Sequence, residues 1–276
     1  MKKVILFCVI ALFSFSFALA ETLTVGCATK CDTFFRLALR RVGRLNDVNI
    51  RVVDVSQNGA EIAWDNYDAI ILPGGADIDP KYYLSAVEPE LQEYTRSLDH
   101  LVNYSAEGRR RDPIEFNLLK KYFSNPQLKD LPVLGVCRGM QMLAVSQGIP
   151  LYVDIKTELG IRNRRYLWDR INMNEEEGDS LMSSIFPHSF RAFKRHHQGV
   201  RVDYFKEHSD RWSHLSLTAF SNSGKIAEAL EFKDRPVLGV QFHPENDFGF
   251  ERKRIFNWLI SKALERKKLI ERVSQK

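Results

Sequence analysis

One apolar pentapeptide occurs twice in this sequence, and a different set of polar residues follows each copy. Pro132–Val136 and Pro236–Val240 both read Pro-Val-Leu-Gly-Val. The first copy leads into Cys137, and the second leads toward His243 and Glu245. A short, continuously apolar run is typical of a strand that is covered on both faces of its sheet. Nothing around the two copies matches, so we interpret them as two interior strands of one sheet and not as a repeated domain.

Strand-like and helix-like segments alternate along the chain. The continuous apolar runs are Leu23–Cys27, Ile50–Val55, Ala69–Leu72, Val133–Val136 and Val237–Phe242. The helix candidates are Asp32–Leu45, Ile114–Phe123, Met140–Gln147 and, at the end of the chain, Phe250–Val273, with Ile255, Trp258, Leu259 and Leu264 facing inward. This alternation predicts an α/β fold with an open, mostly parallel central sheet flanked by helices, of the flavodoxin-like kind.

Two segments do not fit this pattern. Tyr94–Arg111 and Lys156–Arg195 combine poor periodicity with many charges. Long irregular insertions in a compact domain tend to be lids or binding loops, and surface decoration is an equal alternative. Because the chain shows no domain linker and no low-complexity tract, we expect residues 21–276 to form a single domain.

The first twenty residues have the pattern of an export signal. Lys2 and Lys3 precede an apolar run from Val4 to Phe17, and Ala18-Leu19-Ala20 has the small-x-small form of a cleavage site. The alternative is an uncleaved anchor, although the run is short for a membrane span. We expect residues 1–20 to be removed and the protein to be periplasmic or secreted, with no membrane attachment afterwards.

Charge and cysteine content set further limits. The formal net charge of +5 is too small to indicate binding to nucleic acid. Beyond the signal, the cysteines are Cys27, Cys31 and Cys137. Cys27 and Cys31 could pair in an oxidising compartment, and the sequence does not decide this.

The segment around Cys137 has the pattern of a nucleophile elbow. Gly135-Val136-Cys137-Arg138-Gly139 has the form G-x-C-x-G where a predicted strand meets a predicted helix. The turn needs glycine where backbones approach closely. It also exposes the sulfur to helix amides that favour a thiolate. We therefore predict that Cys137 is a nucleophile, the alternative being a buried structural cysteine.

His243 and Glu245 supply what a thiolate nucleophile needs, a base and a group that orients it. They are two positions apart, so in an extended chain their side chains point the same way, and Pro244 keeps His243 out of the α region. Glu245 can then accept from one imidazole nitrogen and leave the other for the thiol. Parallel strands end at one edge of a sheet, so we expect Cys137 and His243 to meet there.

A glycine pair follows a third strand, in Leu72-Pro73-Gly74-Gly75-Ala76-Asp77. The backbone N–H groups of Gly75 and Arg138 are suited to form an oxyanion hole, although a plain turn explains the glycines about as well.

His196-His197-Gln198-Gly199 is the remaining cluster. Adjacent histidines in a strand point to opposite faces, and the spacing matches no zinc pattern. We therefore expect neither a metal nor a cofactor. One of these histidines is expected to line the pocket or to have a packing role in the core.

Together, these motifs resemble the class I glutamine amidotransferase superfamily. The motifs are Pro-x-x-Gly-Val-Cys-Arg-Gly-Met-Gln, His-His-Gln-Gly and Gly-Val-Gln-Phe-His-Pro-Glu, with Leu-Pro-Gly-Gly-Ala-Asp earlier in the chain. The closer match is the stand-alone hydrolase branch of gamma-glutamyl-gamma-aminobutyrate hydrolase-like cysteine peptidases. The similarity runs from about Ala69 to Glu245, and Lys156–Phe190 diverges.

The resemblance implies a role for each matching residue. It implies that Cys137 is the nucleophile, His243 the base and Glu245 its orienting group. It also implies that Gly75 and Arg138 provide the oxyanion amides.

Three further residues, His197, Gln198 and Gln141, match positions where the resemblance implies contact with the substrate. The stretch from Arg111 to Glu115 resembles the branch's R-D-x-x-E motif, and we interpret it as mainly structural.

The leading hypothesis from the sequence is an exported cysteine hydrolase. It would cleave the amide bond of a small gamma-glutamyl substrate through a thioester and release glutamate. One alternative is a glutaminase subunit that supplies ammonia to a partner synthetase, and another is a binding protein that has lost activity. A homodimer is possible, and the sequence does not identify the leaving group.

Overall fold

The computed structural model describes residues 20–29, 31–55, 62–161, 167–247, 249 and 253–274. The predicted export signal therefore lies outside the described residues, apart from Ala20. Within the described part of the chain, none of the helices has the length and apolar character that crossing a membrane requires.

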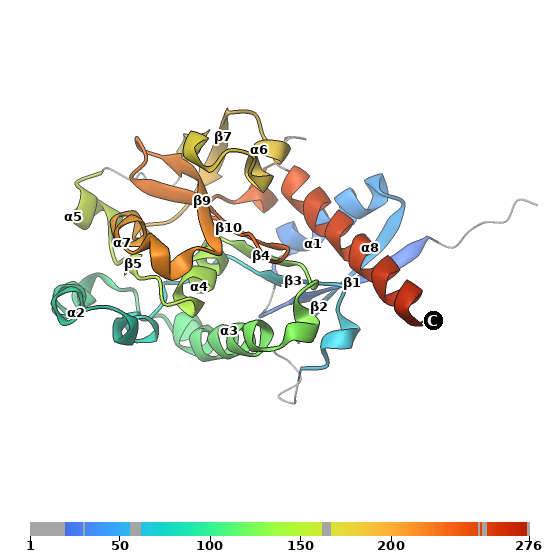
Figure 1. Ribbon diagram of the computed structural model, residues 1–276, viewed down its shortest axis with the longest axis horizontal. Coiled ribbons are helices and arrows are strands. Elements are labelled where there is room, and N and C mark those ends of the chain that lie inside the picture. Colours follow the sequence, from blue (N-terminus) through green and yellow to red (C-terminus); the bar gives the residue numbers. More distant parts are fainter. Residues whose placement is uncertain are drawn as a thin grey trace, which may run out of the picture.

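A long sheet forms the centre of the molecule (Figure 1). In the described residues it has nine strands, in the spatial order β2 (Val48–Asp54), β1 (Glu21–Cys27), β3 (Ala69–Leu72), β4 (Val133–Val136), β11 (Val237–Val240), β10 (Ile226–Phe232), β9 (Leu215–Ser221), β6 (Leu167–Met173) and β7 (Ser189–Lys194). The strands from β2 to β11 are parallel, and those from β10 to β7 add an antiparallel extension. The predicted α/β fold class is confirmed. β5 (Leu151–Tyr152) and β8 (Gly199–Val200) form a separate small sheet.

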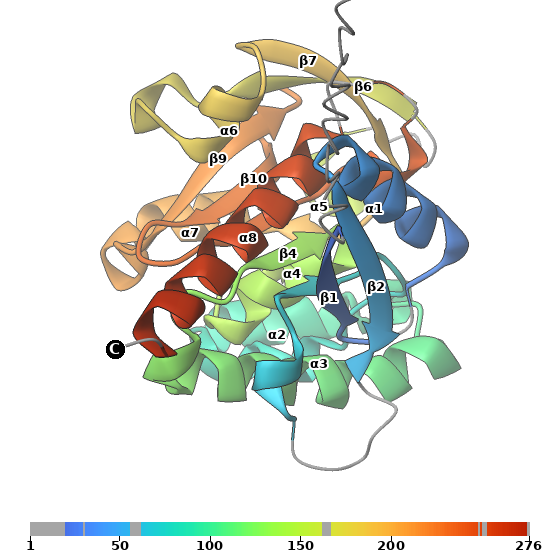
Figure 2. The ribbon, with the colours of Figure 1, turned by 90° about the vertical axis from the view of Figure 1, so that its right-hand side faces the viewer.

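Helices cover both faces of the parallel strands. The helices of the described residues are α1 (Thr33–Leu45), α2 (Pro89–Ser97), α3 (Ala106–Ser124), α4 (Arg138–Ser146), α5 (Ile155–Leu159), α6 (Leu181–Ile185), α7 (Val202–Glu207) and α8 (Arg254–Ser274). Figure 2 shows α1 and α8 packed together on one face, while α3 and α4 belong to the core of the opposite face. Ile70 and Ile71 of β3 are both fully buried and belong to the two different cores. Covering on both faces therefore explains the continuous apolar runs.

The two copies of the pentapeptide lie side by side. β4 pairs with β11 in parallel, with Gly135 opposite Gly239 and Val136 opposite Val240. The interpretation as two neighbouring interior strands is confirmed. The residues that follow the two strands consequently leave the sheet at the same edge and at the same level.

Two helices begin earlier than predicted: α3 by eight residues, and α4 at Arg138 instead of Met140. α3 begins at Ala106, with Ser105 as its N-cap. The prediction started the helix at Ile114, after Pro113, but Pro113 lies inside the helix. The hydroxyl oxygen of Ser105 accepts from the Gly108 N–H at 3.0 Å. At the end of the chain, Ile255 and Leu259 of α8 are buried as predicted, while the expected start of this helix, at residues 250–252, lies outside the described residues.

The prediction that Tyr94–Arg111 and Lys156–Arg195 are irregular is wrong. The first segment contains the end of α2 and the start of α3, and the second contains α5, β6, α6 and β7. In β7, buried positions alternate with more exposed ones, and Lys194 occupies a buried position. A half-exposed antiparallel strand with a buried lysine lacks the continuous apolar run that marks an interior strand.

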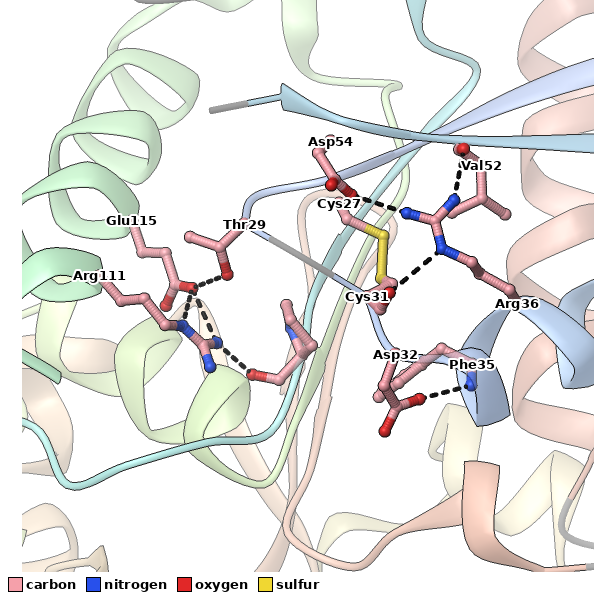
Figure 3. Close-up of a disulfide and its surroundings, with 11 residues drawn as sticks. Cys27, Thr29, Cys31, Asp32, Phe35, Arg36, Val52, Asp54, Arg111 and Glu115 are labelled. Atoms are coloured by element: carbon pink, nitrogen blue, oxygen red, sulfur yellow. Dashed lines mark hydrogen bonds and ion pairs between the residues drawn. A yellow bond between two sulfur atoms is a disulfide. The ribbon is translucent and has the colours of Figure 1, made fainter. Parts of the chain in front are cut away.

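A disulfide fixes the connection between β1 and α1. Cys27, the last residue of β1, is bonded to Cys31, and both are buried. Asp32 caps α1 by accepting from the Phe35 N–H at 2.9 Å, and Arg36 donates to the Cys31 carbonyl at 3.1 Å (Figure 3). The pairing that the sequence left open is therefore present in the structure.

Removing the disulfide should destabilise the fold without abolishing it. For the double variant Cys27→Ser/Cys31→Ser we expect the free energy of unfolding to fall by about 2 kcal/mol, because closing so short a loop removes little entropy from the unfolded chain. Equilibrium denaturation of the variant and of the oxidised wild type measures the difference. A reductant should lower the stability of the wild type alone, and equal stabilities in all states would contradict the prediction.

Candidate active site

Cys137 lies in a strained turn between β4 and α4. Its φ of +51° falls in the region that favours glycine, and its N–H donates to the Val240 carbonyl at 2.7 Å. A Cβ on Gly135 would lie 2.6 Å from the carbonyl of Gly139, and one on Gly139 would lie 2.0 Å from the Leu72 oxygen. Only glycine fits at these two positions, so the predicted elbow is confirmed in its backbone. Such a conformation persists only where the surroundings enforce it.

Cys137 and His243 face the same space. The position that a Cβ on Gly74 would occupy lies 3.0 Å from Cε1 of His243 and 3.6 Å from Cβ of Cys137. Both side chains line one cavity, and both are buried. The structure thus brings together the two residues that the sequence placed at one edge of the sheet, and glycine at position 74 keeps the space between them open.

Glu245 holds the imidazole of His243. The His243 Nδ1 and the Glu245 Oε1 are 2.6 Å apart. The expected extended segment is wrong, however, because Pro244–Asn246 forms the 3-10 helix η9, with Pro244 as its first residue. The contact between His243 and Glu245 forms nevertheless, and the His243 N–H donates to the Phe193 carbonyl at 2.9 Å.

The charges around the ring favour an imidazolium. Burial lowers the pKa of His243, but the neighbouring Cys137 and Glu245 outweigh it, and the net pKa lies well above its ordinary value. Because Nδ1 is bound to Glu245, the buried Nε2 is the ring nitrogen that remains for an interaction with the Cys137 sulfur. The ring of His243 is therefore suited to be an imidazolium beside the sulfur of Cys137.

The loop after β3 carries the proposed oxyanion amide of Gly75. Arg111 of α3 donates to the carbonyls of Gly74 and Pro73, both at 2.8 Å. A Cβ on Gly75 would lie 2.1 Å from the Arg111 guanidinium, so a larger residue here would displace the Arg111 side chain that binds the loop. The N–H of Arg138 belongs to the first turn of α4, where amides have no partner within the helix. Gly75 lines the cavity and Arg138 directly follows Cys137, which lines it too, so an oxyanion role for the two amides stays a prediction.

A buried ionic cluster joins these two amide-bearing segments. Glu115, fully buried in α3, pairs with Arg111 at 2.9 Å and with the side chain of Arg138, which also binds Asp112 at 2.5 Å. Thr29 donates to Glu115 at 3.0 Å (Figure 3). Burial raises the pKa of Glu115, but the two arginines outweigh it and hold the pKa below its ordinary value. These contacts agree with the structural interpretation of the R-D-x-x-E stretch.

The three residues expected to contact the substrate all line the cavity, yet protein contacts engage each of them. Gln141 Nε2 donates to the Gln198 carbonyl at 2.9 Å and to Gln241 at 3.1 Å. Gln198 Oε1 accepts from the Ile78 N–H at 3.0 Å. His197 lies between the carboxylates of Asp77 and Asp154. The structure thus gives these residues partners within the protein, and substrate contact stays a prediction.

His196 differs sharply from its neighbour. It is buried, and its Nδ1 lies 2.8 Å from the Gln198 carbonyl. Burial, and then the charge of Lys194, lowers its pKa to about 3. Lys194 is itself buried and pairs with Glu228 at 2.6 Å and Asp169 at 3.0 Å. His196 is therefore neutral at physiological pH.

The cavity has a volume of about 510 Å³ and opens at the carboxyl edge of the parallel strands. Residues that follow β1, β3, β4 and β11 line it, as expected for an open α/β sheet. Sequence reasoning did not single out Asp32, Asn103, Ser105 and Arg195, which also contribute. The position of Asp32 after a predicted strand was a usable signal, whereas the loop residues offered none. Within the described ranges, no three His, Cys, Asp or Glu side chains are arranged to hold a metal ion.

The pairing of sulfur and imidazole predicts the reactivity of the thiol. At pH 6, iodoacetamide should alkylate Cys137 at least about tenfold faster in the wild type than in the His243→Gln variant, because an imidazolium stabilises the thiolate and an isolated thiol is almost fully protonated. Mass spectrometry of the Cys137 peptide measures the rates. A matched control is His188→Gln, since His188 is exposed and pairs with Glu175. Equal rates in wild type and His243→Gln would contradict the pairing.

Comparison with known families and proteins agrees with the fold. The profile of the family described as Peptidase C26 matches residues 48–245, a range that includes Cys137, His243 and Glu245. The chain is 29% identical over 188 residues to the protein NtpR of Enterococcus hirae, covering 66% of this chain and 68% of that protein. It is 30% identical over 198 residues to the putative glutamine amidotransferase-like protein YvdE of Lactococcus lactis, covering 68% and 71%.

Solved structures share the fold at low sequence identity. A glutamine amidotransferase from Thermotoga maritima superposes with a TM-score of 0.50 at 18% identity, covering 90% of this chain and 86% of that one. A GMP synthase-like protein from Thermoplasma acidophilum superposes with a TM-score of 0.57 at 16% identity, covering 90% and 98%. Identity this low supports the fold and says nothing of the reaction.

Proposed function

The chain belongs to the peptidase C26 family, and from this membership and the geometry of the site we propose that it is a cysteine hydrolase of gamma-glutamyl amides. The family and its relatives support a hydrolase or glutaminase-type reaction at an amide bond. The observation that carries the finer proposal is the row of sulfur, imidazole and carboxylate from Cys137 to Glu245, in a cavity sized for a small molecule.

The reaction begins with attack of the Cys137 thiolate on the side-chain carbonyl of the gamma-glutamyl group. The tetrahedral oxyanion accepts from the N–H groups of Gly75 and Arg138. The C–N bond breaks as His243 gives its proton to the departing amine, leaving a thioester on the sulfur. Water then attacks the thioester and gives its proton to His243. The C–S bond breaks, and glutamate and the thiolate are released.

Glu245 fixes the tautomer of His243 throughout this cycle. It remains bound to Nδ1, so that Nε2 is the nitrogen that exchanges protons. Because Glu245 is buried, its charge acts on the ring with little screening.

We propose further that this reaction takes place outside the cytoplasm. Two features support this: the signal-like pattern of residues 1–20 and the Cys27–Cys31 disulfide, a bond typical of oxidising compartments. A gamma-glutamyl peptide or amine, or glutamine itself, is then the class of substrate to test.

A glutaminase reaction that delivers ammonia to a partner synthetase is the second candidate. The relative from Lactococcus lactis is described as glutamine amidotransferase-like, which favours this interpretation. Both reactions form the same thioester, so the substrate preference of the isolated protein separates them. Release of glutamate from gamma-glutamyl amines and peptides favours the hydrolase, and turnover restricted to glutamine favours the glutaminase.

Cys137→Ala should abolish turnover and preserve the fold. We expect no release of glutamate from glutamine, gamma-glutamyl amino acids or gamma-glutamyl amines, because the thiol that forms the thioester is removed. Glutamate release is measured enzymatically, and circular dichroism checks the fold. His188→Gln should keep the wild-type rate, and glutamate release by Cys137→Ala at the wild-type rate would end the proposal.

Glu245→Gln should lower kcat by about a hundredfold or more, because the amide cannot both orient the ring and stabilise its positive charge. The KM should change little, since Glu245 acts through His243. Steady-state kinetics on the best substrate of the panel measures both. A rise in KM at constant kcat would show instead that Glu245 binds the substrate.

A further inference from the structure

His197 is held on both sides of its ring by carboxylates. Its Nε2 lies 2.9 Å from both oxygens of Asp77, and its Nδ1 lies 3.3 Å from Asp154. The side chains of Asp77 and Asp154 are 11% and 18% exposed, so water screens these contacts only in part.

This geometry selects one protonation state. Ionised carboxylates only accept hydrogen bonds, so both contacts are satisfied at once only when both ring nitrogens carry a proton. A neutral ring would turn one lone pair toward a carboxylate. His197 therefore fits its surroundings as the imidazolium.

The contacts of His197 and Gln198 fix the loop that carries Gly75. Asp77 is two residues beyond Gly75, and the next residue, Ile78, donates its N–H to Gln198 at 3.0 Å. The second oxygen of Asp77 also accepts from the Asn103 N–H at 2.8 Å.

The other side of the ring is anchored to α5. Asp154 caps that helix by accepting from the Thr157 N–H at 2.7 Å. The His197 carbonyl accepts from the Ile155 N–H, the first of α5, at 2.8 Å. The ring thus links a fixed helix end to the loop of the oxyanion hole.

We propose that His197 is a positioning residue and a pH-sensitive latch: as the imidazolium it ties the Gly75 loop to α5, and loss of its proton loosens that loop. The proposal rests on the proposed function, because it is the oxyanion amide of Gly75 that the latch positions. It assigns His197 a role other than contact with the substrate.

The charges around the ring set the direction of the pH dependence. In the described part of the chain, the titratable groups that act on the ring are Asp77 from the loop after β3, Asp154 ahead of α5, and the neighbouring neutral His196. The bond to Asp77 raises the pKa of His197 more than burial lowers it, and Asp154 adds to the rise. A raised pKa means that the latch is fully present below the ordinary histidine pKa of about 6.5. It is lost as the pH rises through the folded-state value.

An NMR titration tests the latch without any substrate. In the wild type, the His197 ring and the Gly75 amide should titrate with one midpoint, above the ordinary histidine value. In His197→Gln the Gly75 amide should lose this transition, and in Asp154→Asn the midpoint should move to lower pH, because one carboxylate no longer favours the imidazolium. A Gly75 amide that does not follow the ring would overturn the latch.

Kinetics separates positioning from binding. We expect His197→Gln to lower kcat about tenfold to a hundredfold, as misplacement of a catalytic group does, while the KM stays within about twofold. His188→Gln should match the wild type, and thermal unfolding of both variants should show that they are folded. A rise in KM at unchanged kcat would mean that the ring binds substrate and would overturn the proposal.

A wild type that hydrolyses no gamma-glutamyl amide, yet shows the shared midpoint, would refute the proposed function and leave the latch standing.

Discussion

The backbone turn at Cys137 is the constraint on which the rest of the site depends. Its φ of +51° is unfavourable for a residue with a side chain, so the surroundings must hold it. They do so through the hydrogen bond to Val240 on the neighbouring strand and through glycines that let α4 approach the ends of β3 and β4. The in-register pairing of β4 with β11 then fixes where the chain leaves both strands. The distance between sulfur and imidazole is thus set by the sheet and not by flexible loops.

The buried ion pairs of α3 hold in place the two segments that carry the Gly75 and Arg138 amides. Glu115 is fully buried between Arg111 and Arg138, so each arginine is paired inside the protein. A buried ion pair is weak evidence for stability, because desolvation offsets much of the attraction. Its benefit here is geometric: Arg111 grips the carbonyls of the Gly75 loop, and Arg138 begins α4. One helix, α3, therefore contacts both segments that carry the proposed oxyanion amides.

The sequence indicated those parts of the molecule whose structure depends on residues close together in the chain. Strands buried on both faces show as apolar runs, and the elbow shows in its glycines, so the five parallel strands and the meeting of Cys137 with His243 were predictable. The antiparallel extension was not, because β7 is half-exposed and buries the charge of Lys194, whose partners on β6 and β10 are remote in sequence. Pro113 hid the first turns of α3, and the turn at Pro244 replaced the expected extended segment. Sequence also could not show that His197 faces two carboxylates, since only the fold brings them together.

On this geometry the sulfur of Cys137 and the ring of His243 act as one electrostatic unit, and the pKa of the ring reports the coupling between them. An NMR titration of His243 in the wild type and in Cys137→Ala measures the coupling without any substrate. Because burial alone lowers the pKa of this ring, and the neighbouring sulfur opposes that effect, we expect a clearly lower pKa in the variant. An unchanged pKa would show that the sulfur and the ring do not interact, and the proposed catalytic pair would then be wrong.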